Sequence, residues 1–256
     1  MSKLKIRSRH PSHDILRGEI NTGRKLIVFR LGSNTEVPGA IEINKVEACM
    51  NSANKREMKR LFTENNVITA LWTFPQNEEQ LRTFIAENQL EEKKVIIKSL
   101  RGSRGRGLYL MNTGNEAIEW FRAKGFGGHI IEKYYNYSKE YRLHVTAEGY
   151  FYTCRKMLKE DAQERWYRND SNCVWIMEEN PLFEKPSSWQ TIEEHCVKAL
   201  NAVGLDFGAC DVRVQTEAPN GRAPQFIICE INSAPSFGDV TAEKYKEQLT
   251  KFINNL

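Results

Sequence analysis

The chain has 256 residues and a formal net charge of +4, with 40% hydrophobic and 27% charged residues. This composition is typical of globular domains and excludes disordered and fibrous classes. No apolar run approaches the roughly 20 residues of a membrane-spanning helix, and the polar start lacks the apolar centre of a secretion signal, so we expect a cytoplasmic protein.

Residues 1–50 show the least regular pattern, with one apolar strand predicted at residues 26–29 and a turn near Pro38-Gly39. This segment is too short for a complete nucleotide-binding α/β domain. Met58, Leu61 and Phe62 follow helical spacing and predict an amphipathic helix over residues 52–64. A short strand over residues 67–72 is expected next.

The middle of the chain alternates helices and strands. Asn77 can cap a helix that buries Leu81, Phe84 and Ile85, and strands are predicted at residues 95–98 and 108–111. Thr113 and Glu116 have the spacing of a capping box, which predicts a helix that ends at Gly125. A strand over residues 129–132 follows.

The second half contains hairpins. Strands are predicted at residues 140–146 and 150–157, joined by a turn at Glu148-Gly149, and residues 159–187 show an irregular, polar pattern. A helix over residues 188–203 is expected to end at Gly204. Strands at 208–215 and 225–231 and a helix at 241–253 complete an α+β fold with two lobes.

Two carboxylates interrupt the last pair of apolar strands. Residues two apart share a strand face, so Glu230 and Asn232 point the same way, and Asp211 joins them if the strands are antiparallel neighbours. Carboxylate and amide oxygens suit Mg²⁺, which completes its shell with water and substrate phosphates. The alternative is a polar edge that faces solvent.

A strand-ending lysine, Lys98, runs into a glycine-rich loop that contains Gly102, Ser103, Gly105 and Gly107. Glycines let backbone N–H groups approach phosphate oxygens, and the lysine adds a positive charge. The alternative is a mobile surface loop. A Walker A loop is excluded, because no Lys-Ser/Thr follows the final glycine.

Further candidates lie at the ends of the central strands. Glu132, Lys133 and Tyr134 link the two halves, where a backbone could pair with an adenine edge, although an ordinary strand end fits equally well. Downstream, cations that face inward would suit a triphosphate, and otherwise form a solvated edge. This group comprises Arg142, which shares a strand face with Glu140, together with Arg155 and Lys156.

Taken in order over residues 43–237, these motifs resemble the ATP-grasp superfamily, and within it the RimK-like group of carboxylate–amine ligases. The resemblance implies an ATP-grasp fold that holds the nucleotide between two α+β lobes. It implies a shortened N-terminal segment at 1–50, a small lobe with the glycine-rich loop at 51–134 and a large lobe with the metal site at 135–256. The Asn232-Ser-Ala-Pro235 ending is its most specific match.

The resemblance also assigns roles to residues. Lys55 and Lys98 match the two ATP lysines, Gly102 to Gly107 match the loop over the triphosphate, Glu132 to Tyr134 match the adenine hinge, and Glu140 takes the ribose-contacting position. Asp211, Glu230 and Asn232 match the metal ligands. The catalytic cations that it implies near the γ-phosphate and the acyl group are Arg142, Arg155, Lys156 and Arg168.

The implied activity is ligation of a carboxylate to an amine through an acyl phosphate, with ATP and Mg²⁺ as cofactors and Mn²⁺ as a possible replacement. Either substrate could be macromolecular; a membrane partner is not expected, and a nucleic-acid partner is possible but not indicated. A kinase that phosphorylates a hydroxyl and a non-catalytic ATP-binding module remain as alternatives. A nucleotidyl-transferring ligase with Lys98 as nucleophile fits poorly, because Leu100-Arg101-Gly102 follows where that motif needs Asp-Gly.

Overall fold

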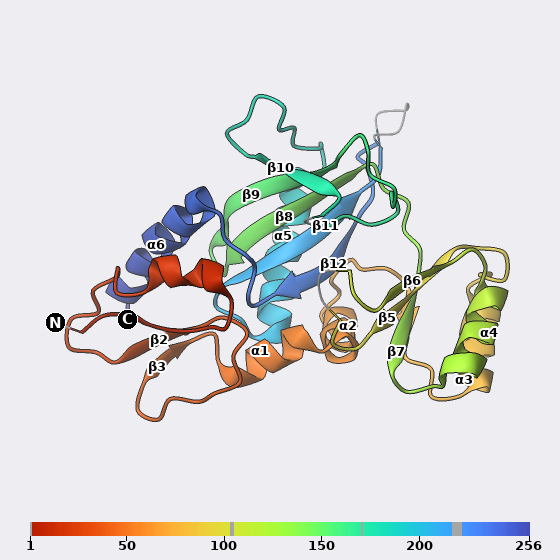
Figure 1. The fold of residues 1–256 in the computed structure, drawn as a ribbon, viewed down its shortest axis with the longest axis horizontal. Coiled ribbons are helices and arrows are strands. Elements are labelled where there is room, and N and C mark those ends of the chain that lie inside the picture. Colours follow the sequence, from red (N-terminus) through yellow and green to blue (C-terminus); the bar gives the residue numbers. More distant parts are fainter. Residues whose placement is uncertain (1, 103–104, 170, 217–221) are drawn as a thin grey trace.

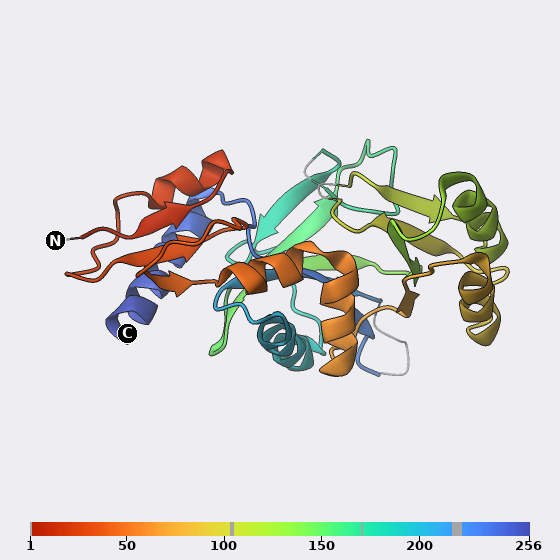
Figure 2. The same cartoon turned by 90° about the horizontal axis from the view of Figure 1, so that it is seen from below.

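The computed structural model describes residues 2–102, 105–169, 171–216 and 222–256, and within them the strands form three sheets. The N-terminal sheet and the four-stranded sheet lie at opposite ends of the molecule, with the five-stranded sheet between them (Figures 1 and 2). We call the four-stranded sheet with its two helices the small lobe, and the five-stranded sheet the large sheet. The arrangement matches the predicted α+β class.

The N-terminal segment, residues 2–43, is more regular than its sequence indicates. Three parallel strands and a 3-10 helix form it: β1 (Lys5–Arg7), β2 (Ile27–Arg30), β3 (Ile41–Ile43) and η1 (Pro11–Leu16). Sequence analysis predicted only the β2 strand, because three-residue strands carry too little alternation to detect. They are ordered instead by distant partners, since Phe29 and Ile43 pack in one apolar cluster with Phe207 and with Tyr245 of α6 (Asp239–Asn254).

Asn44 joins the N-terminal segment to the large sheet. It is fully buried with a left-handed φ of 61°, and its amide nitrogen donates to Arg30 O (3.2 Å) and Phe207 O (2.9 Å). Its amide oxygen accepts from the backbone N–H groups of Asp206 and Phe207, both at 2.9 Å. One side chain therefore satisfies four backbone groups across this junction.

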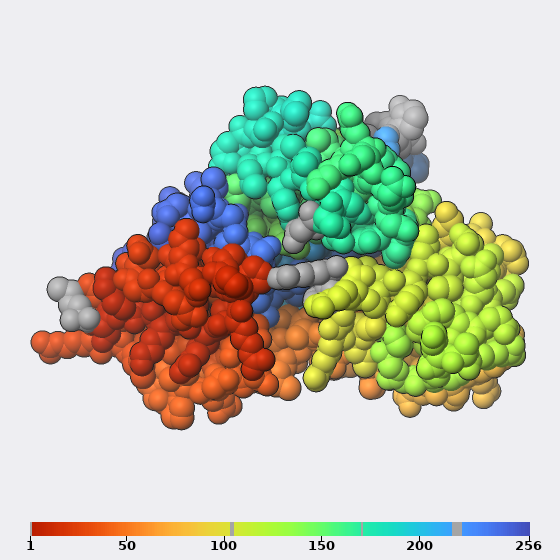
Figure 3. Space-filling model, viewed as in Figure 1, coloured from red at the N-terminus to blue at the C-terminus, as the bar shows by residue number. Residues whose placement is uncertain are grey.

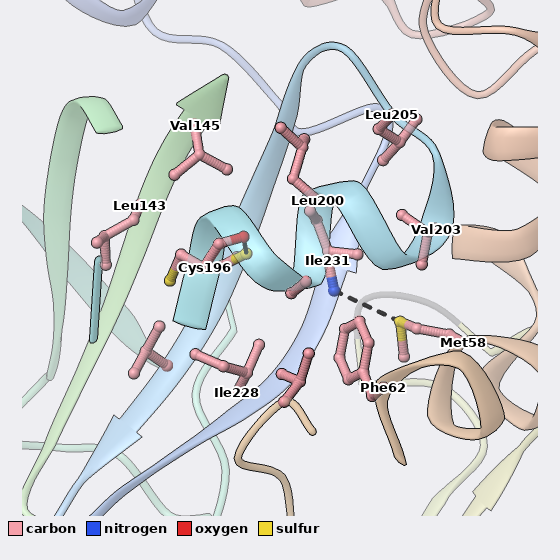
Figure 4. Close-up of a cluster of buried hydrophobic side chains, with 14 of the residues drawn as sticks. Met58, Phe62, Leu143, Val145, Cys196, Leu200, Val203, Leu205, Ile228 and Ile231 are labelled. Atoms are coloured by element: carbon pink, nitrogen blue, oxygen red, sulfur yellow. Dashed lines mark hydrogen bonds between the residues drawn. The ribbon is translucent and has the colours of Figure 1, made fainter. Parts of the chain in front are cut away.

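Two helices follow where a single helix was predicted: α1 (Val46–Ala53) and α2 (Lys55–Glu64). Asn54 separates them, because its extended backbone ends α1 while its side chain accepts from the N–H groups of Arg56 and Glu57 and caps α2. Met58 and Phe62 of α2 pack in the core of the large sheet (Figure 4). The boundary expected at residue 51 remains a prediction.

The small lobe carries a sheet in the order β4-β7-β5-β6, covered by two helices. Asn77 and Thr113 cap these helices as predicted, by accepting from Gln80 N (2.9 Å) and Glu116 N (3.0 Å). The expected strand at 67–72 shrinks to two residues, since Ile68 O meets the large sheet through Ile228 N at 2.8 Å. The elements are β4 (Trp72–Thr73), α3 (Glu78–Glu87), β5 (Val95–Ser99), β6 (Leu108–Met111), α4 (Gly114–Lys124) and β7 (His129–Lys133).

The large sheet is antiparallel throughout, in the order β10-β9-β8-β11-β12. The predicted hairpin at Glu148-Gly149 is confirmed, whereas β10, a continuous run of five apolar residues, lies in the region predicted as irregular. The elements are β8 (Lys139–Thr146), β9 (Gly149–Leu158), β10 (Cys173–Met177), α5 (Trp189–Val203), β11 (Gly208–Val214) and β12 (Phe226–Asn232).

The two faces of the large sheet differ in chemistry. One face is apolar and packs against α5, where Leu200 meets strand residues such as Leu143 and Ile231 (Figure 4). Strand alternation turns Glu140, Arg142 and their neighbours to the opposite face. The packing against α5 thereby fixes the position of the polar residues on the opposite face.

In the part of the chain that the structure describes, none of the helices has the length and apolar character that crossing a bilayer demands.

We predict that Asn44→Ala lowers the free energy of unfolding by roughly 3–4 kcal/mol, because buried backbone groups lose their partners and alanine disfavours a positive φ. Urea unfolding measures the loss. The matched control is Asn66→Ala, since Asn66 is exposed with a φ of 53° and should cost only about 1 kcal/mol. Equal losses in the two variants would show that the hydrogen bonds of Asn44 contribute nothing.

Candidate functional site

A cavity of about 600 Å³ lies where the N-terminal segment, the small lobe and the polar face of the large sheet meet. Figure 3 shows it as a hollow bordered by the red N-terminal segment, the yellow part of the small lobe and the green part of the large lobe. The cavity brings together most of the predicted site residues: Lys55, Lys98, Gly102, Gly105, Glu140, Arg142, Lys156, Arg168, Asp211, Glu230 and Asn232.

Asp211 stands at the centre of the polar face. It pairs with Glu230 across β11 and β12 and with Arg142 across β11 and β8. Arg142 donates to both carboxylate oxygens, Nε to Oδ1 at 2.8 Å and Nη2 to Oδ2 at 2.9 Å, and the Lys156 ammonium lies 3.1 Å from Oδ2. The antiparallel register places all these groups side by side.

A second carboxylate, Glu140, extends this network. It accepts from Lys156 Nζ at 2.8 Å and from Arg213 Nε at 3.1 Å, so that Lys156 bridges Glu140 and Asp211. Burial alone would raise the pKa values of both carboxyl groups, and the facing cations outweigh it, so both pKa values are lowered. The two side chains are therefore anionic at neutral pH although they are buried.

Glu230 and Asn232 share a strand face beside Asp211, as alternation predicted. A bulge places one extra residue, Cys229, between Ile228 and Glu230, because Asp211 opposes Glu230 while Val212 opposes Ile228. Burial acts to raise the pKa of Glu230, and the Lys55 ammonium, 3.4 Å away, is the main group that lowers it.

These donors fit a hard divalent cation. Asp211, Glu230 and Asn232 offer two carboxylates and an amide oxygen on the wall of one cavity. Among the described residues no group of three or more His, Cys, Asp or Glu side chains is poised to hold a metal. A metal here would need further oxygen ligands from water or phosphate, which is the usual mode of Mg²⁺.

The glycine-rich loop forms the roof of the cavity. Lys55 holds it by two hydrogen bonds, from Nζ to Gly102 O (3.0 Å) and from its backbone N–H to Leu100 O (2.9 Å). Gly105 has a φ of +79°, and a Cβ there would lie 3.0 Å from the Tyr167 ring, so glycine permits the close approach of loop and large lobe. Gly107 lies at the base of the loop, and Ser103 falls outside the described residues.

The residues predicted as the adenine hinge lie at the end of β7 and directly after it. Glu132, Lys133 and Tyr134 do not line the cavity, and the backbone N–H groups of Lys133 and Tyr134 already donate to Leu71 O and Lys94 O. The Glu132 carboxylate points into the protein, 2.7 Å from Lys98 Nζ and 3.2 Å from Lys59 Nζ. The Glu132 carboxylate therefore holds Lys98 in position.

Arg155 also lies apart from the other predicted cations. Strand alternation puts it on the face opposite Lys156, where its guanidinium is 3.9 Å from Glu184. Arg168 does reach the cavity. It is held there by Lys156 O (3.1 Å) and Ser138 O (2.8 Å), with its guanidinium over the Tyr137 ring.

Sequence reasoning missed several groups on the cavity wall. Arg213 belongs there and could have been included, since it shares a strand face with Asp211. Ser8, Arg9 and His10 reach the cavity from the N-terminal segment, where the pattern gave no signal. Lys59 supports Lys98 through Glu132, yet its place on α2 does not mark it as buried.

No family model and no curated protein sequence matches the chain. Solved structures do. D-Alanine–D-alanine ligase from Bacillus anthracis aligns with a TM-score of 0.62 at 12% identity, over 96% of this chain and 82% of that chain. N5-carboxyaminoimidazole synthase from Aspergillus clavatus, in complex with ADP and its ribonucleotide, gives 0.63 at 16% identity, over 89% and 60%.

The ATP-grasp ligase PsnB, complexed with a minimal precursor, aligns with a TM-score of 0.58 at 16% identity, over 85% of this chain and 64% of that chain. Another PsnB complex also holds Mg and ADP. This chain thus spans less than two thirds of the PsnB chain in the first complex and of the synthase. The likeness shows that the chain has the ATP-grasp fold.

We predict that Glu132→Gln lowers stability at pH 7 by about 3 kcal/mol, because it leaves Lys59 buried without a countercharge. Burial would raise the pKa of Glu132, but Lys59 and Lys98 lower it to about 2. The ionised form therefore stabilises the fold above the unfolded pKa near 4.3, and this contribution is lost as the pH falls towards 2.

Urea unfolding at pH 7 and pH 3 tests this prediction. The difference in the free energy of unfolding between the wild type and Glu132→Gln should be smaller at pH 3 than at pH 7. Glu87→Gln is the matched control, since Glu87 is an exposed glutamate of the same lobe and should change stability by less than about 0.5 kcal/mol. Equal free energies of unfolding for the wild type and Glu132→Gln at pH 7 would show that the Glu132 carboxylate does not stabilise the fold.

Proposed function

We propose that the chain is an ATP- and Mg²⁺-dependent carboxylate–amine ligase of the RimK-like kind, which forms an acyl phosphate and releases ADP and phosphate. The observation that carries the proposal is the cavity itself. Three oxygen donors for a metal, Asp211, Glu230 and Asn232, face it together with cations from both lobes. This donor set suits a nucleotide triphosphate better than an uncharged ligand.

The nucleotide phosphates would lie between Lys98 and the metal ligands. Lys98 is fixed by Glu132, and Lys55 ties the glycine-rich roof to α2, so both lysines are preorganised before a ligand enters. Glycines of the roof would bring backbone N–H groups close to phosphate oxygens. Glu140 remains the proposed ribose contact, although Lys156 and Arg213 already occupy its oxygens.

Mg²⁺, held by Asp211, Glu230 and Asn232, would supply charge neutralisation and orient the phosphates. Arg142 and Lys156 are the chain's own groups at the same place, and both are locked by ion pairs to Asp211. Fixed cations can stabilise charge that develops during phosphoryl transfer without reorganisation. Arg168, with its guanidinium held by two carbonyls, completes this set, whereas Arg155 on the other face is not included.

The proposed ligase activity agrees with the structural neighbours, which include a D-alanine–D-alanine ligase and the ATP-grasp ligase PsnB in complex with Mg and ADP. The division into a small lobe and a large lobe around the nucleotide is part of the same proposal.

We predict that Mg-ATP raises the melting temperature of the wild-type chain and that ATP with excess EDTA raises it less, because the metal would join the phosphates to Asp211 and Glu230.

We also predict that Lys98→Met weakens nucleotide binding about tenfold, because the proposed contact of Lys98 with the phosphates is lost. Lys94→Met, an exposed lysine just before the same strand, is the control and should bind like the wild type. A folded wild-type chain with no shift at millimolar Mg-ATP would refute the ATP site.

We predict that hydroxylamine, offered with Mg-ATP and a productive carboxylate, yields a hydroxamate and free phosphate, because an acyl phosphate is a strong electrophile. A size-fractionated cell extract supplies candidate carboxylates, and mass spectrometry follows the products. Lys156→Met should abolish hydroxamate formation. Stable transfer of labelled γ-phosphate to a hydroxyl, without hydroxamate, would replace the ligase by a kinase.

A further inference from the structure

A serine and a histidine of the N-terminal segment form a hydrogen-bonded pair in the cavity wall. Ser8 follows β1 directly and lines the cavity, and its hydroxyl lies 2.5 Å from Nδ1 of His13, a fully buried residue of η1. The Ser8 oxygen also accepts from the backbone N–H of His10 at 3.0 Å. Two hydrogen bonds thus fix this hydroxyl at the cavity. We call Ser8 and His13 the hydroxyl–imidazole pair.

The tautomer of His13 follows from its second contact. Its Nε2 lies 2.7 Å from the carbonyl oxygen of Pro235, which can only accept, so Nε2 carries the proton and donates it. Burial is the largest cause of the lowered pKa of His13, and the ring is therefore neutral at neutral pH. In the neutral ring Nδ1 is an acceptor, so the Ser8 hydroxyl donates to it. The Nδ1 lone pair is thus directed at the Ser8 proton.

The pair is anchored beside the proposed metal ligands. Pro235, which accepts from His13, follows Asn232 closely in the chain, and Pro235 and Asn232 both line the cavity. Ser52 Oγ donates to Ser233 Oγ at 3.0 Å, which holds this stretch against α1. The hydroxyl–imidazole pair therefore lies at the end of the cavity where phosphoryl transfer is proposed.

The other acid–base groups at this end are already engaged. Among the described residues of the cavity, Asp211 and Glu230 are committed to the proposed metal, and Glu140 accepts from two cations. His10 accepts at Nδ1 from the backbone N–H of Ser12 at 3.2 Å, so its proton lies on Nε2. A proton that leaves a substrate here needs another acceptor, and the hydroxyl–imidazole pair has the geometry to take it.

We propose that Ser8 accepts the proton of the incoming amine and passes its own hydroxyl proton to Nδ1 of His13. This inference rests on the proposed function, in which an amine attacks an acyl phosphate. The amine nitrogen forms a bond to the carbonyl carbon, and the bond from that carbon to the phosphate oxygen breaks with its electron pair. The proton then returns from His13 through Ser8 to the released phosphate, which leaves the pair neutral.

Two nucleophiles separate this role from a purely structural one. Hydroxylamine attacks acyl phosphates without a base, whereas an alkyl amine must lose its proton as the amide forms. Loss of the hydroxyl–imidazole pair should therefore slow amide formation and leave most hydroxamate formation intact. Because both products come from the same acyl phosphate, their ratio does not depend on the fraction of a variant that folds.

The test gives the full chain Mg-ATP and the size-fractionated extract, which supplies carboxylate and amine, in parallel reactions with and without hydroxylamine. Mass spectrometry follows both products. Ser8→Ala should lower the ratio of amide to hydroxamate about hundredfold, since a general base contributes roughly 10²–10⁴ in rate. Ser8→Thr keeps the hydroxyl and should restore most of the ratio. Ser12→Ala is the control, because it removes a histidine-bound hydroxyl of η1 that lies outside the cavity wall.

His13→Asn separates proton uptake from orientation of the hydroxyl. The amide oxygen of asparagine can accept from Ser8 close to the place of Nδ1, but it cannot take up the proton. The ratio of amide to hydroxamate should therefore fall as far as in Ser8→Ala. A His13→Asn variant with the wild-type ratio would overturn the proposal.

An unchanged ratio in Ser8→Ala, or an equal loss in Ser12→Ala, would also overturn the proposal. An acyl ester found on Ser8 by mass spectrometry would make Ser8 a nucleophile instead of a proton acceptor. Hydroxamate without amide in the wild type would show that the pair serves no amine, and would sink this inference while the ligase chemistry stands. A wild-type chain that forms neither product would refute the ligase and this inference together, so the two failures are distinguishable.

Discussion

The bidentate ion pair between Arg142 and Asp211 connects the chemistry of the cavity to the architecture of the large sheet. Its two members face each other across β8 and β11, so the pair forms only in one antiparallel register. A shift of β8 by one residue would turn Arg142 into the α5 core and leave the buried Asp211 without this partner, and uncompensated buried charge is costly. The apolar packing behind the sheet therefore also holds the site in place.

Buried charge is organised in the same way on the small lobe. Glu132 stands between Lys59 of α2 and Lys98 of β5, so one carboxylate joins an element of the large-sheet core to a strand of the small lobe. Lys55 makes a similar link from α2 to the glycine-rich loop. The helix that packs on the large sheet thus positions Lys98 and the glycine-rich loop of the opposite lobe.

Alternation in the sequence was sufficient to find Asp211, Glu230 and Asn232, because strand period and residue chemistry agreed there. It could not reveal that Glu132 turns towards Lys59, since a strand pattern gives the face of a residue but not its partner. The short strands β1 and β3 were not predicted for a related reason, because their apolar residues pack against Phe207 and Tyr245, which lie far along the chain. The local sequence pattern predicts elements and the faces of their residues, whereas long-range contacts determine the short strands and the partners of buried side chains.

The shared cluster of the N-terminal segment and α6 has a consequence for how the chain folds. The strands β1 to β3 end at Ile43, whereas α6 begins at Asp239, so the apolar face of the first sheet is covered by residues that are synthesised after the strands of the large sheet. Until then that face is exposed to aggregation or to a chaperone. The wall of the cavity that carries Arg9 would therefore be completed only after the strands of the large sheet have been synthesised.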